Sequence, residues 1–528
     1  MKPTCPRSLR FRIVPALAAV LLLGLSAPVL ASDMPYYSYT YDQWGRPVES
    51  PSGYEPVEFF GGLDLGVGSL SGPTDLFVAG DGRLYILDAG NGRVIIVPPD
   101  RQDPVVVDRF TLVGVENALN APEGLFVTPD GLIYIADTGN ERVVVTDETG
   151  AIRRTFRKPG TTGPAGSDGG DGDTGVFPPE AAFAPQKLVL DRMGTLYIVC
   201  KGIGQGAVLY SRDGDFLGFF GGNKVEVTAG LLLDRFWKSI LSQEARDKLS
   251  RYIPVEYSSI AIDGESFVYS CTVNSGSTLN MIRKINPMGI NILETRATRS
   301  FQGGFGDLQP VWYNNTLVRT QFIDLCVGDD GLITALDSTR GRLFQYDQDA
   351  NLLFAYGGLG AQLGMFRNPV AVDTLGRDIL VLDKAGAGIT RLTPTEFGRR
   401  VHTAMALYND GRYQEAVEPW NQVLKYDSHF NLAYIGIGKA LLETGQPRAA
   451  MESFRIGHDP DGYDLAYAEY RTDTLRRNFL WYFLAAVLAI AYGYGRNIPV
   501  VRRWERRVLS AVGSRLRRHR PGKGGGAA

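Results

Sequence analysis

One sequence unit recurs six times between residues 73 and 392, and it constrains the fold more than any other feature of this 528-residue chain. Each copy has an apolar segment, a glycine-containing turn, a second apolar segment with an acidic or small residue at its end, and a third apolar segment. The second segments end at equivalent positions: Asp88, Asp137, Cys200, Cys271, Asp337 and Asp383. Short strands at this spacing, separated by Asp-Gly or Gly turns, predict a mainly β fold with six propeller blades.

The two clearest copies carry the same local motif. They read Leu-Tyr-Ile-Leu-Asp-Ala-Gly-Asn-Gly-Arg-Val over 84–94 and Ile-Tyr-Ile-Ala-Asp-Thr-Gly-Asn-Glu-Arg-Val over 133–143. Both segments closely resemble the NHL repeat family. The third and fourth copies depart from it, since they have cysteine in place of aspartate and lack Asn-x-Arg. The resemblance implies a six-bladed NHL-type β-propeller, which we expect to occupy residues 57–395.

The two ends of this ring are predicted to meet in one blade. Residues 57–62 are similar to the outer-strand segments at 217–222 and 353–358, whereas the last copy has only three strands before the pattern becomes helical at Thr393. We therefore expect strand 57–62 to complete the sixth blade, which removes two exposed sheet edges. The Tyr- and Pro-rich lead, residues 32–56, is expected to pack along a domain edge, and stacking on sugars is the alternative.

The N-terminus and the C-terminal region carry membrane-related features. Residues 1–31 place basic residues before a short apolar run and end in small residues, which predicts a cleaved signal peptide, with a retained N-terminal anchor as the alternative. Residues 478–496 contain an uncharged stretch with aromatic residues at both ends, which predicts a transmembrane helix, with a buried helix of a soluble domain as the alternative.

The tail at 497–528 is strongly basic, so we expect it to lie in the cytoplasm and the propeller to lie outside the cell membrane. The overall net charge of −2 hides this asymmetry and says little about partners. An anionic membrane surface, and not nucleic acid, is the predicted partner of the tail. Its predicted contact residues are Arg502, Arg503, Arg506 and Arg507.

Residues 396–477 have a helical period, and their small and aromatic positions recur 34 residues later. The first set is Ala404, Ala406, Leu407, Gly411, Tyr413, Ala416 and Trp420; the second is Gly438, Ala440, Leu441, Gly445, Pro447, Ala450 and Phe454. This spacing resembles the tetratricopeptide repeat (TPR), which implies a short all-α domain of paired helices. A docking site for another protein and a rigid stalk are both open.

Polar residues at the beginnings of the innermost strands are the predicted ligand-binding site at the channel mouth. They are Thr74, Asp75, Glu123, Gln186, Lys187, Ser258, Asp324 and Asn368. All four histidines lie outside the blades, so the histidine-bound zinc site of related amidating lyases cannot form. No cofactor is expected, and calcium, as in gluconolactonase-like propellers, is the alternative that these oxygen ligands suit. The alternative is a polar lining of a solvated channel.

Two insertions and three cysteines complete the candidates. The Gly/Asp-rich segment 159–175 contains the metal candidates Asp168, Asp171 and Asp173, although their spacing does not fit an EF-hand. Residues 228–252 predict an amphipathic helix that covers apolar blade surface or recognises a partner. No disulfide is expected among Cys200, Cys271 and Cys326.

Together these features resemble bacterial membrane-anchored proteins that combine NHL and TPR repeats. The resemblance implies an extracytoplasmic scaffold or sensor that binds protein or glycan, and we assign no catalytic residues. Two alternatives stay open. One is a calcium-dependent, lactonase-like hydrolase that uses Glu123 and Asn368, and the other is an accessory subunit of an envelope transport system.

Overall fold

The computed structural model describes residues 34–159, 177, 181–222, 256–273, 278–293, 304–313, 315–495, 503 and 507. Several sequence predictions therefore lie outside the described residues. These are the signal peptide, the helix at 228–252, Asp168, Asp171, Asp173, Arg502 and Arg506. The chain forms two compact units, one comprising Met1–Gly411 with Glu418–His429 and the other comprising Arg412–Val417 with Phe430–Ala528.

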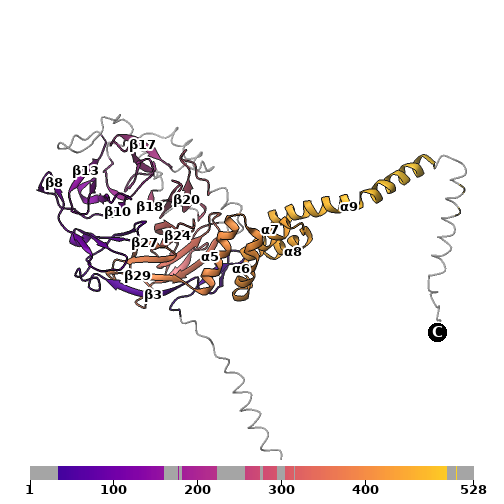
Figure 1. Cartoon of the computed structure of the whole chain (residues 1–528), viewed down its shortest axis with the longest axis horizontal. Coiled ribbons are helices and arrows are strands. Elements are labelled where there is room, and N and C mark those ends of the chain that lie inside the picture. The colour runs from indigo at the N-terminus through magenta and orange to yellow at the C-terminus, as the bar shows by residue number, and fades with distance from the viewer. Residues whose placement is uncertain are drawn as a thin grey trace, which may run out of the picture. The chain divides into compact units, whose positions relative to one another are not determined.

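Six antiparallel sheets form the blades of a β-propeller (Figure 1). Blades one and two consist of β4 (Asp75–Val78), β5 (Leu84–Asp88), β6 (Arg93–Val97) and β7 (Val105–Val107), then β10 (Gly124–Val127), β11 (Ile133–Asp137), β12 (Arg142–Thr146) and β13 (Ile152–Arg157). Blades three and four consist of β14 (Pro185–Leu190), β15 (Leu196–Cys200), β16 (Ala207–Tyr210) and β17 (Phe216–Phe220), then β18 (Tyr257–Ile262), β19 (Val268–Thr272) and β20 (Ile282–Ile285). Blades five and six contain β23 (Phe322–Val327), β24 (Ile333–Asp337), β25 (Arg342–Tyr346) and β26 (Leu352–Gly357), then β27 (Pro369–Leu375), β28 (Asp378–Asp383) and β29 (Gly388–Pro394). The predicted six-bladed fold class is confirmed.

The hydrophobic core lies between neighbouring blades. For example, Tyr85 and Val107 of blade one belong to one buried cluster with Leu125 and Ile135 of blade two. The second strands β5, β15, β19 and β24 are buried along their whole length. Sheets that are covered on both faces favour continuous apolar strands, and this explains why the second segment of each repeat is the most apolar.

The ring closes through an N-terminal strand. β3 (Tyr54–Gly61) pairs antiparallel with β29 through seven residue pairs, from Gly61 opposite Gly388 to Tyr54 opposite Pro394. The sequence pattern placed this strand in the sixth blade, and the structure begins it three residues earlier than the pattern did. The pairing satisfies the backbone hydrogen bonds of β29, which would otherwise form an exposed sheet edge.

The lead forms a hairpin of β1 (Tyr39–Tyr41) and β2 (Pro47–Glu49), and this hairpin extends blade five to six strands. β1 joins the outer strand β26 through the pair Tyr39 and Ala355. Tyr39 and Tyr41 are buried in the core between blades four and five. The expected packing along a domain edge therefore occurs through strand pairing, which composition did not predict.

Helix α5 (Glu396–Asn409) begins directly after β29. Its first turn contacts Ser52 and Gly53, the two residues before the closing strand β3. The N-cap residue Thr395 accepts a hydrogen bond from Gly398 N at 3.1 Å and donates one from its hydroxyl to Ser52 O at 2.7 Å. A Cβ atom at Gly398 would lie 2.1 Å from Gly53 O, so only glycine fits this close approach. Helix α6 (Tyr413–Tyr426) follows, and Asp427 accepts a hydrogen bond from Ser50 Oγ at 2.9 Å.

The second unit contains α7 (Asn431–Glu443), α8 (Pro447–Ile456) and α9 (Pro460–Gly495). Pro447 occupies the first turn of α8, where a missing N–H has no cost. A Cβ atom at Gly438 would lie 2.8 Å from the Phe454 ring, so this small residue allows α7 and α8 to approach. The TPR assignment of these helices stays a prediction.

Helix α9 is long and apolar enough to cross a membrane, with a mean hydropathy of 1.3 over its most apolar 18-residue window. The predicted span, residues 478–496, lies within α9 up to Gly495, and its last residue lies outside the described residues. Exposed aromatic residues occur near both ends of the apolar stretch, as interfacial residues of a span do. Arg503 and Arg507 occupy exposed helical positions beyond α9, and their contact with a membrane surface stays a prediction.

A buried histidine joins α5 to blade five. His402 Nε2 lies 2.9 Å from Gln345 Oε1, and the imidazole ring lies 5.7 Å from the Tyr54 ring and 5.9 Å from the Phe354 ring. Nδ1 has no hydrogen-bond partner in the described part of the chain. Burial, with a further contribution from the charge of Arg377, lowers the pKa of His402 to about 4.

This burial predicts an acid-sensitive contact. In the unfolded chain the pKa of the imidazole is near 6.5, so between pH 6.5 and 4 the unfolded state binds more protons. The stabilisation is present above pH 6.5 and is lost as the pH falls to about 4, by about 3 kcal/mol in total. We expect His402→Gln to flatten the dependence of the thermal unfolding midpoint on pH in this range. Parallel curves for the two proteins would contradict this assignment.

Candidate functional site

The innermost strands of all blades begin at one face of the ring, which we call the entrance face. Thr74, Glu123, Gln186, Ser258 and Asn368, the entrance residues, lie there and are half-buried or exposed. Four of them bond across blade boundaries. The Thr74 hydroxyl donates to Pro122 O at 2.9 Å, Gln186 Nε2 donates to Glu123 Oε2 at 3.2 Å, and the Ser258 hydroxyl donates to Phe322 O at 2.6 Å. Glu123 also pairs with Lys201 of blade three.

The other three predicted residues lie together inside the ring. Lys187 Nζ is 2.6 Å from Asp75 Oδ1 and 3.0 Å from Asp324 Oδ1. Both aspartates are buried, and 16% of the Lys187 side chain is exposed. Burial alone would lower the pKa of Lys187, but the charges of Asp324 and Asp75 raise it well above its usual value. This axial triad is therefore a charged group that joins blades one, three and five.

The remaining bonds of the two aspartates connect the other blades. Asp75 Oδ2 accepts from Leu125 N of blade two at 2.8 Å. Asp324 accepts from the Ser259 hydroxyl of blade four at 2.6 Å and from Val372 N of blade six at 2.9 Å. The two carboxylates of the triad are thus used in holding the ring together.

Asp373 completes this network, although it was not among the residues predicted from the sequence. Its Oδ2 accepts from Val78 N at 2.7 Å, which joins blade six to blade one. Burial raises the pKa of Asp373 to about 7, against the effect of that backbone hydrogen bond. An available sequence signal was the acidic residue on an otherwise apolar inner strand.

The NHL-type motif of blades one and two is a clamp on the loop that enters each blade. Asp88 Oδ1 accepts from Ser71 N at 2.7 Å, and its Oδ2 accepts from Asn91 Nδ2 at 2.7 Å and from Arg93 Nε at 2.8 Å. Asp137 forms the same three contacts with Asn120, Asn140 and Arg142. The motif residues therefore have a structural role in these two blades.

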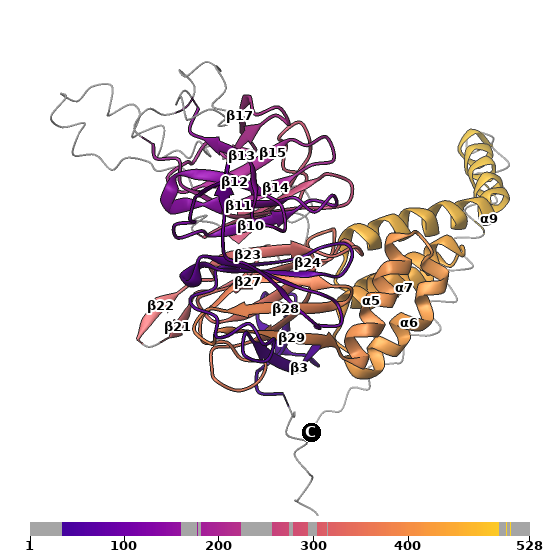
Figure 2. The same ribbon diagram turned by 60° about the vertical axis from the view of Figure 1, so that its left-hand side comes forward.

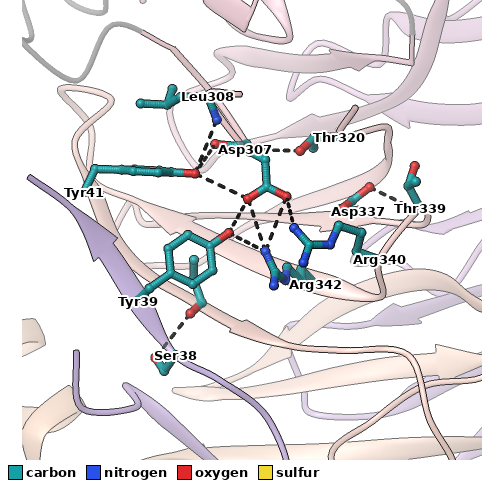
Figure 3. Close-up of polar contacts among 12 residues, drawn as sticks. Ser38, Tyr39, Tyr41, Asp307, Leu308, Thr320, Asp337, Thr339, Arg340 and Arg342 are labelled. Carbon is teal, nitrogen blue, oxygen red and sulfur yellow. Dashed lines mark hydrogen bonds and ion pairs between the residues drawn. The ribbon is translucent and has the colours of Figure 1, made fainter. Parts of the chain in front are cut away.

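Blade five uses the equivalent arginine differently (Figure 3). Arg342 turns away from Asp337 and lies 3.2 Å from Asp307 Oδ1 and 2.8 Å from the Tyr39 hydroxyl. Arg340 adds a second ion pair to Asp307 at 2.9 Å. Asp337 Oδ2 consequently has no hydrogen-bond partner among the described residues, and burial raises the pKa of Asp337 to about 6. The arginines of blade five thus fix the lead.

The described residues contain no group of three His, Cys, Asp or Glu side chains placed to hold a metal ion. Calcium binding by Glu123 and Asn368 stays a prediction. Asn368 is exposed, and its backbone N–H donates to Asp383 Oδ1 at 2.9 Å. Cys200, Cys271 and Cys326 are buried free thiols.

An exposed apolar hairpin lies in the connection from blade four to blade five. It consists of β21 (Val311–Tyr313) and β22 (Thr316–Val318), with Trp312 opposite Leu317. Trp312 is 73% exposed and Leu317 is 52% exposed. Figure 2 shows the hairpin projecting from the side of the propeller opposite to α5, which is the entrance face. Two asparagines between apolar runs were a sequence signal for this turn, and Asn315 has φ of 58°.

Comparison with known proteins agrees with this fold. Residues 119–145 match the family model described as NHL repeat. The chain is therefore a six-bladed β-propeller protein that contains an NHL repeat. Comparison with curated proteins gives no match.

Several solved structures are similar to the chain. Virginiamycin B lyase from Staphylococcus aureus is 10% identical, with a TM-score of 0.34, over 65% of this chain and 99% of that chain. A gluconolactonase from Xanthomonas campestris is 12% identical, with a TM-score of 0.33, over 66% and 97%. The extracellular domain of a putative hybrid two component system from B. thetaiotaomicron is 10% identical, with a TM-score of 0.33, over 60% and 33%. Likenesses at these values say nothing about activity.

The axial triad makes a stability prediction. Lys187→Met leaves two buried carboxylates without their cation, so we expect a loss of about 3–5 kcal/mol in the free energy of unfolding. The matched control is Lys201→Met, which removes a more exposed pair with Glu123 and should cost about 1 kcal/mol or less. Denaturant unfolding of the two variants measures both values. Equal losses would show that the triad does not hold the ring together.

Proposed function

We propose that this protein is a membrane-anchored, extracytoplasmic scaffold or sensor that binds another protein or a glycan. The observation that carries this proposal is the Trp312 and Leu317 pair, which is exposed on a hairpin of the entrance face. Paired apolar side chains of this size in water are typical of binding surfaces, and tryptophan is enriched among the residues that dominate binding energy.

The chemistry of the axial triad and of the entrance residue Glu123 supports a binding role over catalysis. Both carboxylates of the axial triad bond to Lys187 and to backbone N–H groups of neighbouring blades. A catalytic carboxylate must be free to bind a substrate, a proton or a metal ion, and these two are used for structure. Glu123 is likewise paired with Lys201 and Gln186.

The proposed location follows from α9 and from the charge of the tail. One helix suited to span a membrane lies near the C-terminal end, and a basic segment follows it. Under the positive-inside rule the tail is cytoplasmic and the propeller is outside, and the signal peptide predicted from the sequence supports the same orientation. An envelope transport system is one class of partner that such an anchored platform could serve.

A site-specific cross-linking experiment tests the scaffold proposal. A photoreactive amino acid at Leu317 is expected to give a discrete covalent adduct in native envelopes, and Trp312→Ser should reduce its yield by about tenfold. The matched control is the same photoreactive group at Met193, which is 83% exposed on a turn of the opposite face. No adduct at Leu317, or equal yields at both positions, would contradict the proposal.

The lactonase alternative is tested by calcium binding. Calorimetric titration of the full-length protein with calcium is expected to give no stoichiometric heat, because Glu123 is paired with Lys201. Binding of one calcium ion that is lost in Glu123→Gln would instead favour a calcium-dependent hydrolase and would justify a screen of lactones. Asn368→Ala provides the second ligand test, and Asp64→Asn provides a surface control.

A further inference from the structure

A basic pocket lies between α5 and the end of α6, within the same compact unit as the propeller. Its volume is about 390 Å³, and its described lining residues are Arg400, Gln422, Lys425 and Tyr426. Two of these four side chains are cationic and none is acidic. A concave surface with this charge attracts an anionic group and repels cations.

Arg400 is held in place but keeps unused donors. Its NH2 group pairs with Glu396 Oε1 at 2.6 Å, one turn earlier on α5. Its Nε atom is buried and has no hydrogen-bond partner among the described residues. A guanidinium has five N–H donors and is always charged, and 31% of the Arg400 side chain is exposed, so its terminal nitrogens can bind a further carboxylate while Arg400 keeps Glu396.

The other lining residues complete an organic anion site. Lys425 is exposed and forms no ion pair within the described part of the chain. Gln422 lines the pocket and donates from Nε2 to Glu418 Oε1 at 2.9 Å, so its carbonyl oxygen still has the capacity to accept a hydrogen bond. Tyr426 is 49% exposed, and its ring lies 6.0 Å from both the Phe397 ring and the Arg400 guanidinium. The pocket therefore offers two cations, an amide and an apolar wall.

From this geometry we propose that the basic pocket binds a carboxylate side chain and an adjacent apolar side chain of an acidic peptide segment in a partner protein. Arg400 and Lys425 bind the carboxylate, Gln422 accepts a hydrogen bond from the peptide backbone, and the apolar side chain lies on Tyr426. This rests on the proposed scaffold function, but it concerns a surface distinct from the Trp312 hairpin.

The charge around the pocket favours a peptide over a bilayer. Binding to anionic lipid surfaces requires a cluster of several basic residues, and its strength grows with each added cation. Helices α5 and α6 instead mix signs, with Glu396, Glu415 and Glu418 close to the basic residues along the sequence. A two-cation site in a mixed surface suits a single carboxylate.

Fluorescence anisotropy with the full-length protein in neutral-lipid nanodiscs tests the proposal. The probe is a labelled peptide, acetyl-Asp-Glu-Leu-Glu-Asp-amide, and its control is the Asn/Gln isostere. We expect Arg400→Gln and Lys425→Gln each to weaken binding of the acidic peptide by about tenfold, and the isostere not to bind. Replacing the peptide leucine with alanine should weaken binding about threefold through loss of the Tyr426 contact.

The matched control is Arg399→Gln, which removes one positive charge from the neighbouring position of α5 and does not line the pocket. It should change the affinity by about twofold or less. Equal losses in Arg399→Gln, or no binding of the peptide, would overturn the inference. Loss of peptide binding in discs rich in phosphatidylserine would show that anionic lipid competes for the pocket. That result would assign the pocket to lipid and would also overturn the inference. A Leu317 adduct is measured separately, so failure of the pocket leaves the scaffold proposal testable.

Discussion

The pairing of β3 with β29 is the constraint on which the rest of the first unit depends. It joins two segments from opposite ends of the propeller sequence, and it leaves the six blades no arrangement except a ring. Thr395 N also donates a hydrogen bond to Gly53 O at 3.0 Å. The N-cap residue of α5 is therefore bonded to the residue that directly precedes the closing strand. The helix is therefore positioned by the closure, because Ser52 and Gly53 are fixed only when β3 is in place.

Closure of the ring also brings polar groups of the inner strands together at the axis, and the axial triad provides hydrogen bonds and ion pairs for them. Six inner strands that face one axis bring polar backbone and side-chain groups together, and Asp75 and Asp324 are buried among them. A buried ion pair is costly when it stands alone, and a hydrophobic substitute is often as stable. In this ring both aspartates hold Lys187; Asp75 also bonds to blade two, and Asp324 also bonds to blades four and six. The charged groups thus fix the positions of the blades, a role that apolar side chains cannot fill with the same specificity.

Periodic features were predictable from the sequence, and contacts between irregular segments were not. The repeat predicted six blades, and the similarity of residues 57–62 to outer strands predicted the closing strand. Both predictions were possible because they depend on local sequence patterns. The same register correctly placed Asp75, Lys187 and Asp324 on inner strands. It could not show that they meet, since their contact depends on the diameter of the ring. The contacts of Arg342 could not be predicted either, because its partners Asp307 and Tyr39 lie in segments without a repeat.

The topology places the two proposed binding surfaces of the first unit apart from each other. Inner strands begin at the entrance face, where the Trp312 hairpin projects, whereas the third strand β29 ends at the opposite face and leads into α5 (Figure 2). The basic pocket on α5 and α6 therefore lies away from the hairpin. A partner held at one surface leaves the other accessible, and both surfaces belong to one compact unit. This separation is what a scaffold needs, because two partners can then be held at once without competing for the same side chains.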